Sequence, residues 1–154
     1  MRIVLQRVTE AAVTMGKTDT RRIGKGLVAL VGFGEGDTQK EADFLAAKMC
    51  ELRIFEDGGG NMNLSLLDVG GGALLVPNFT LYASCKKGRR PSFTNAMPPE
   101  KASLLFGYFV GVVKEIIPDV QTGVFGSHML VEIDGYGPVT IILDSGEIMP
   151  KLHM

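Results

Sequence analysis

Two short segments place a proline and a threonine close together beside an apolar stretch: residues 76–81 (VPNFTL) and 136–140 (YGPVT). Neither segment carries the acid, base or metal ligands that most hydrolytic sites use. If the two segments form one pocket, the chemistry there must depend largely on backbone groups and on the substrate itself. This requirement narrows the range of reactions that the chain can catalyse.

An ester is already activated, so modest stabilisation of a tetrahedral oxyanion is enough to hydrolyse it. Backbone N–H groups supply such stabilisation, and each donor contributes about 2.7–4 kcal/mol in known hydrolases. The Phe79-Thr80 peptide, just after Pro77, is the best candidate for this role. The Thr80 hydroxyl is either a nucleophile or a hydrogen-bonding group that orients the substrate, and the lack of a nearby base favours the second role. The alternative for Thr80 is an ordinary β-branched strand residue.

The Gly137-Pro138 pair allows two interpretations. Most X-Pro peptide bonds are trans, so an ordinary turn is one of them. A cis bond would instead hold the Gly137 carbonyl rigidly outward. Such a carbonyl can bind an amino group or block one stereochemical face of a substrate.

The chain lacks the residues that other common catalytic mechanisms require. The chain has only two histidines, His128 and the penultimate His153, and we interpret His128 as a structural residue beside a strand. A serine or cysteine triad therefore has no evident base. Cys50 and Cys85 stand alone, without a CxxC pair, so we expect reduced thiols. The sequence contains no cluster of residues at the spacing of metal ligands and no nucleotide-binding fingerprint. It therefore predicts neither a metal nor a cofactor.

The composition predicts one globular domain, residues 1–154, with 45% hydrophobic and 21% charged residues. No apolar run approaches the roughly 18 residues that span a bilayer, and the N-terminal residues do not resemble a signal peptide. We expect a cytoplasmic location and no association with a membrane. The net charge of −1 argues against a generic nucleic-acid binder. A local basic cluster is nevertheless formed by Lys86, Lys87, Arg89 and Arg90. It is either a phosphate contact or a solvated loop, and its position beside the first segment favours a phosphate contact.

The hydrophobic pattern predicts two main helices among several strands. Thr38 and Glu41 form a possible capping box for a helix that runs to about Arg53. A second helix begins at Pro98-Pro99, and Pro118 ends it. Strands are expected at residues 2–8, 26–33, 73–81, 120–125, 129–133 and 139–143. Because Pro77 cannot donate to a sheet, it should lie at an edge or a bulge. Without regular βαβ alternation, this order favours an α+β fold with mostly antiparallel sheets curled around or against the helices.

A series of motifs in order and at the right spacing resembles the D-aminoacyl-tRNA deacylases, also called D-tyrosyl-tRNA deacylases. They are residues 5–8 (LQRV), 53–55 (RIF), 62–64 (MNL), 79–83 (FTLYA), 87–93 (KGRRPSF), 121–126 (QTGVFG) and 137–140 (GPVT). The resemblance covers nearly the whole chain. It implies a homodimer of β-barrel-like subunits that hydrolyses the ester between a D-amino acid and the terminal adenosine of tRNA.

The resemblance also implies roles for individual residues. The Gly137-Pro138 peptide is expected to be cis and to enter the partner subunit's pocket, where it rejects L-amino acids. Thr80 matches a threonine that is often assigned as the nucleophile, although in another account the substrate's 2′-hydroxyl assists. The absence of a base near Thr80 favours the second account. Phe79, Phe125 and Met129 match positions that line the pocket, and a ring there suits a terminal base. The basic loop would then contact tRNA phosphates.

Two departures from the family pattern leave alternatives open. Pro77-Asn78 replaces the usual Ser-Gln, and Gly135-Tyr136 replaces the usual Asn-Asp. A related branch, which clears L-alanine from a threonine tRNA, has proline at the position of Pro77, but Phe79 favours the D-specific group. The alternatives are a deacylase of relaxed chirality, which also clears glycyl- or small L-aminoacyl-tRNA, and a catalytically silent binder of the tRNA 3′ end.

Overall fold

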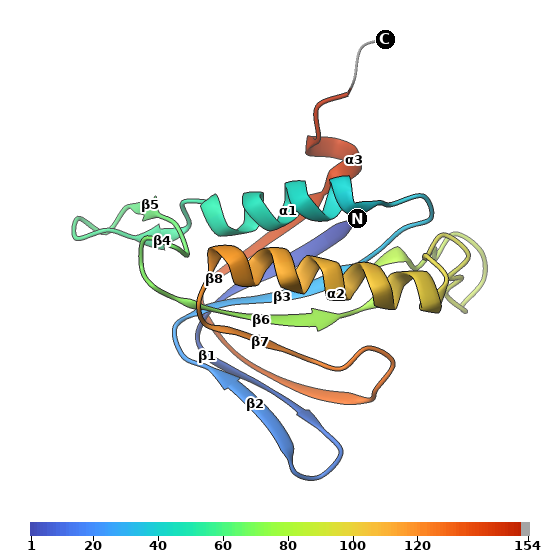
Figure 1. Ribbon diagram of the computed structural model, residues 1–154, viewed down its shortest axis with the longest axis horizontal. Coiled ribbons are helices and arrows are strands. Elements are labelled where there is room, and N and C mark those ends of the chain that lie inside the picture. Colours follow the sequence, from blue (N-terminus) through green and yellow to red (C-terminus); the bar gives the residue numbers. More distant parts are fainter. Residues whose placement is uncertain (152–154) are drawn as a thin grey trace.

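The computed structural model describes residues 1–151 of the chain, and within that range it combines one strongly curved sheet with helices (Figure 1). His153 lies outside the described residues. In chain order the elements are β1 (Arg2–Met15), β2 (Asp19–Ile23), β3 (Gly26–Gly32), α1 (Gln39–Glu51), β4 (Phe55–Glu56), β5 (Met62–Leu64), β6 (Gly72–Pro77), the 3₁₀ helix η1 (Phe79–Tyr82), α2 (Pro99–Ile116), β7 (Val120–Thr122), β8 (Met129–Asp144) and α3 (Ser145–Ile148).

The main sheet has the strand order β2-β1-β3-β6-β7, and β8 pairs with the free side of β1. Strand β1 is antiparallel to β2, β3 and β8, whereas β3, β6 and β7 run parallel to one another. Arg21 of β2 donates a hydrogen bond of 2.8 Å to the Thr122 carbonyl of β7 and so ties the two ends of the sheet together. The predicted α+β, barrel-like fold is confirmed. The sequence analysis expected no regular βαβ alternation and did not identify the two parallel connections, β3–α1–β6 and β6–α2–β7.

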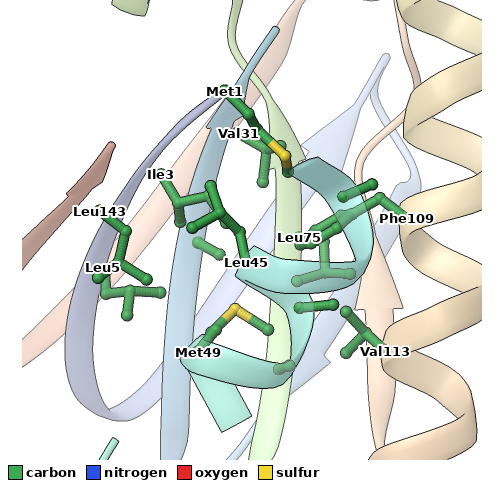
Figure 2. Close-up of a cluster of buried hydrophobic side chains, with 14 of the residues drawn as sticks. Met1, Ile3, Leu5, Val31, Leu45, Met49, Leu75, Phe109, Val113 and Leu143 are labelled. Atoms are coloured by element: carbon green, nitrogen blue, oxygen red, sulfur yellow. The ribbon is translucent and has the colours of Figure 1, made fainter. Parts of the chain in front are cut away.

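Two apolar layers lie on opposite faces of the sheet. Helices α1 and α2 lie side by side over one face, where Leu45, Leu75 and Phe109 are fully buried (Figures 1 and 2). Leu74 and Val76 point into the second cluster, inside the barrel. Because β6 is covered on both faces, it has a continuous apolar run instead of an alternating one.

Both predicted main helices are present with the predicted ends. Thr38 precedes α1 and accepts a hydrogen bond from the Lys40 N–H at 3.2 Å, while its own N–H donates to Glu41 at 2.7 Å. Helix α2 begins at Pro99 and ends at Ile116, just before Pro118. Cys50 of α1 and Cys85 are both free thiols. Burial raises the pKa of the Cys50 thiol to about 12, so this thiol stays protonated in the core.

Several predicted strand limits were wrong. The strand predicted for residues 73–81 ends at Pro77, and a 3₁₀ helix follows it. The first strand runs on to Met15, and the strand predicted for residues 120–125 ends at Thr122. The two strands predicted for residues 129–133 and 139–143 are one continuous strand, β8. Within residues 1–151, no helix is long and apolar enough to cross a membrane.

Candidate active site

The chain leaves the sheet sharply at the end of β6. Pro77 is the last residue paired with β3, and the N–H of Asn78 donates to the Val31 carbonyl at 2.7 Å. Since successive residues of a strand turn their N–H groups to opposite sides, the nitrogen of Pro77 faces the side of β7, whose pairing stops at Leu75. Pro77 therefore lies in an interior strand but at its unpaired end, so that no ladder hydrogen bond is lost.

An aromatic cavity of about 360 Å³ lies beside this turn. Phe79, Phe93 and Phe125 line it, together with Pro77. The rings of Phe79 and Phe93 meet edge to face, with centroids 5.1 Å apart and planes at 70°. The ring of Phe125 packs against the ring of Phe106 in α2, with centroids 6.4 Å apart. Such a slot between aromatic rings is suited to an unpaired nucleobase.

A second, smaller cavity of about 240 Å³ shares Pro77, Phe79 and Gly126 with the first. Asn78 and Met129 also line it. The predicted pocket residues therefore surround these two adjoining cavities: Pro77, Asn78, Phe79, Phe125 and Met129. His128 also lines the smaller cavity and is exposed. Its exposure in this cavity differs from the prediction that His128 is a structural residue, and its place just before the start of β8 was the only signal that the sequence offered.

Thr80 has a polar partner but no base. Its hydroxyl donates to the Oδ1 atom of Asn78. Thr80 is exposed, and it is not among the residues that line the two cavities. The backbone N–H groups of Phe79 and Thr80 have no acceptor among residues 1–151. The arrangement thus leaves two backbone donors available for a ligand and gives the Thr80 hydroxyl an orienting contact.

Gly137-Pro138 lies in a bulge of β8. Gln6 of β1 pairs with Thr140 and Val8 pairs with Gly135, so residues 136–139 stand opposite Arg7 alone. The Gly137-Pro138 peptide bond is cis, as the resemblance implies. Gly137 has φ of +130°, and a Cβ atom there would lie 2.9 Å from the backbone N of Val139. Only glycine meets both conditions without strain.

Arg7 supports this bulge and was not predicted as a site residue. Its side chain is buried, and it donates from Nε to the Tyr136 carbonyl at 3.1 Å and from Nη1 to the Ile54 carbonyl at 2.8 Å. The guanidinium also lies over the Tyr136 ring, with its Cζ atom 5.1 Å from the ring centre. Its Nη2 atom is 3.8 Å from the Oε1 atom of Glu56. The one signal in the sequence is the place of Arg7 between the apolar residues Leu5 and Val8 of β1, because a buried arginine requires partners.

The two proline segments do not form one pocket within the single chain. The cavities beside Phe79 are not lined by Gly137 or Pro138. Tyr136 instead lines a separate cavity of about 390 Å³ with Arg7, Lys25 and Glu56. The structure of a single chain therefore does not provide the single pocket that the sequence analysis considered.

The predicted basic loop is exposed. Lys86, Lys87, Arg89 and Arg90 lie between two reciprocal backbone hydrogen bonds that join Ser84 and Ser92, at 2.7 and 2.9 Å. None of the ion pairs within residues 1–151 involves this loop. Its cations are thus available to a partner. In the part of the chain that the structure describes, no group of three or more His, Cys, Asp or Glu side chains is placed to hold a metal ion.

Known proteins resemble this chain along nearly its whole length. The profile of the family described as D-Tyr-tRNA(Tyr) deacylase matches residues 4–144. A D-aminoacyl-tRNA deacylase from Thermomicrobium roseum is 53% identical over 148 residues, covering 96% of both chains. One from Bacillus velezensis is 50% identical over 145 residues, which cover 94% of this chain and 99% of the relative.

Two solved structures have the same fold. The structure of the c-Myc DNA Unwinding Element Binding Protein has 38% sequence identity and a TM-score of 0.89, covering 94% of this chain and 99% of the other. A probable eukaryotic D-amino acid tRNA deacylase has 18% identity and a TM-score of 0.80, covering 92% of this chain and 97% of the other. At that identity the second likeness concerns the fold alone.

Proposed function

Because the chain belongs to the D-Tyr-tRNA(Tyr) deacylase family, we propose that it hydrolyses the ester bond of D-aminoacyl-tRNA and releases the free D-amino acid and tRNA. The observation that carries this proposal is the pair of adjoining cavities around Phe79, next to two backbone N–H groups without an acceptor among residues 1–151. The proposed location of this reaction is the cytoplasm, where aminoacyl-tRNA is used.

The aromatic cavity is the proposed site of the terminal adenine, between Phe79, Phe93 and Phe125. The smaller cavity, with Asn78 and Met129, then receives the aminoacyl group. Because Phe79 and Pro77 line both spaces, the ester that joins the two parts of the substrate lies beside the Phe79-Thr80 peptide.

In the proposed mechanism, water attacks the ester carbonyl and the N–H groups of Phe79 and Thr80 stabilise the resulting oxyanion. The bond from the carbonyl carbon to the 3′-oxygen breaks, and the neighbouring 2′-hydroxyl of the substrate assists the proton transfer to that oxygen. Thr80 orients the site through Asn78, since its hydroxyl has this amide and no base as its partner. The proposed reaction uses no metal or cofactor.

We propose a homodimer in which Gly137 and Pro138 enter the partner's pocket and reject L-amino acids. The bulge belongs to β8, whose only strand partner among residues 1–151 is β1, and neither Gly137 nor Pro138 lines the aromatic cavity of its own subunit. Beside it, Ile142 is 69% exposed and pairs in register with Val4, which pairs with Leu30 of β3. Val4 and Leu30 are half-buried, so the row is partly exposed, and an apolar row of this kind favours a protein interface.

A deacylase of relaxed chirality is the second candidate, because both departures from the family pattern lie at functional positions. Pro77 and Asn78 line the smaller cavity, and Tyr136 is the bulge residue that Arg7 holds. The third candidate is a silent binder of the tRNA 3′ end. The net charge of −1 does not favour the DNA binding that one structural relative's name denotes.

The deciding experiment is hydrolysis of matched D-, L- and glycyl-tRNA with a chelator present. Fast release from the D-substrate alone supports the proposal. Comparable release from L- or glycyl-tRNA supports the relaxed deacylase. Binding without release from any of the three supports the silent binder and contradicts the proposed hydrolysis.

A further inference from the structure

A polar cavity of about 630 Å³ lies on the other side of the loop that carries Phe93. Residues 93–97 contribute to both spaces: Phe93 and Met97 line the aromatic cavity, and Thr94 and Asn95 line the polar one. The proposed site of the terminal adenine and the polar cavity are therefore separated only by this stretch of chain. A nucleotide next to one that occupies the first cavity can therefore reach the second.

Arg2 presents a fixed plane to this cavity. Its Nε donates to the Asp144 carboxylate at 2.8 Å, and its Nη1 donates to the Leu81 carbonyl at 3.0 Å. Two hydrogen bonds in the plane of a guanidinium fix its orientation, since the group is rigid. The Arg2 side chain nevertheless remains 42% exposed, so part of it is free to contact a ligand.

Tyr82 lies beneath this guanidinium. The Arg2 Cζ atom is 4.6 Å from the centre of the Tyr82 ring. The ring in turn packs against Gly34, where an added Cβ atom would lie only 2.6 Å from the Tyr82 Cε1 atom. Glycine at this position lets the ring approach the backbone, and the ring supports the arginine. Arg2 and Tyr82 thus form a preorganised stack at the cavity, which we call the Arg2–Tyr82 platform.

We propose that the polar cavity binds the unpaired nucleotide that precedes the terminal adenosine, with its base stacked on the Arg2–Tyr82 platform. This proposal rests on the proposed function. Proteins recognise unpaired bases by stacking them on aromatic rings or arginine planes, and backbone phosphates are held by cations. Lys86 lines the same cavity and starts the basic loop, so it is placed for the phosphate. Glu35 also lines the cavity, and a carboxylate accepts hydrogen bonds from an exocyclic amino group such as that of cytosine.

The test compares two substrates with the variants Arg2→Lys and Tyr82→Leu. One substrate is D-aminoacyl-tRNA, and the other is the D-aminoacyl ester of adenosine alone, which has no preceding nucleotide. Lysine keeps the charge of Arg2 but lacks its plane. We expect the KM for the tRNA substrate to rise roughly tenfold in each variant, with kcat unchanged and with the adenosine ester hydrolysed as in the wild type. Arg21→Lys, which alters an arginine bound to Thr122 and Asp19, is the matched control.

Equal losses on both substrates, or no loss on either, would overturn the proposal. A binding measurement keeps the result separate from the proposed function. The unacylated trinucleotide CCA should bind the wild type more tightly than adenosine 5′-monophosphate does, and Arg2→Lys should remove that preference. If the wild type hydrolyses neither ester, the proposed function fails, and the trinucleotide preference still decides whether the platform binds RNA.

Discussion

Arg7 donates from its Nε a hydrogen bond of 3.1 Å to the carbonyl oxygen of Tyr136, across 129 positions of sequence. It is the single residue of β1 that stands opposite the four bulged residues 136–139 of β8. The conformation of the segment that carries Gly137 therefore depends on a side chain from the first strand. A buried arginine and a projecting glycine form one structural unit.

Arg7→Lys should destabilise the fold and loosen this unit. One ammonium group cannot reach both the Tyr136 and Ile54 carbonyls in the geometry of a guanidinium, and a hydrogen bond to a charged group contributes roughly 1.5–3 kcal/mol. We expect a loss of about this size in denaturant unfolding and a lower ratio of D- to L-aminoacyl-tRNA hydrolysis. Arg22→Lys, at an exposed position of β2, is the control. An unchanged ratio of D- to L-aminoacyl-tRNA hydrolysis would show that Arg7 does not contribute to chiral selection.

Gly137→Ala tests the bulge itself, and Gly135→Ala is its matched control on the same strand. At Gly137 the φ of +130° disfavours any side chain, and an added Cβ would lie 3.1 Å from the Arg7 Nη2 atom. At Gly135 nothing lies within 4 Å of an added Cβ. We expect Gly137→Ala to cost about 1 kcal/mol or more of stability and to reduce D-specific turnover or selectivity, while Gly135→Ala changes neither. Equal kinetics for both variants would refute the role given to Gly137.

Thr80→Ala should have only a small effect on kcat. The lost contact is one hydrogen bond to Asn78, and a typical net contribution of about 0.5–1.5 kcal/mol corresponds to a loss of roughly 2- to 12-fold. Substrate ending in 2′-deoxyadenosine should react far more slowly with the wild type, because it lacks the assisting hydroxyl. Single-turnover rates for both cases measure the two effects. A complete loss of chemistry in Thr80→Ala, with a fast deoxy substrate, would instead make Thr80 the nucleophile.

Lys87→Ala and Arg90→Ala should weaken tRNA binding and reduce its dependence on salt. Each lost phosphate contact lowers the slope of log K against log salt concentration by about 0.7 for single strands. The measurement is a titration of tRNA affinity at several salt concentrations. Lys40→Ala, at an exposed position of α1, should leave the slope unchanged. If the loop variants have the slope of the wild type, the basic loop is a solvated surface.

The elements that the sequence predicted correctly have local causes. The capping box at Thr38 and Glu41 begins α1 through contacts within a few residues. Pro99 and Pro118 bound α2 because proline restricts its own neighbourhood. The apolar runs of β3 and β6 mark strands that are buried on both faces. The motifs also indicated the family and several of the residues around the two cavities.

Other features depend on contacts between distant segments, which a local pattern does not encode. The apolar character of residues 78–81 resembles a strand, but the chain turns there because β7 stops short and no other strand among residues 1–151 continues the pairing. Glycine and proline at 135–138 resemble a turn, yet pairing with β1 on both sides keeps β8 continuous and makes the segment a bulge. The burial of Arg7 follows from carbonyls supplied by Tyr136 and Ile54. The sequence by itself therefore determined which residues and elements are available, and the tertiary structure decided which of them meet.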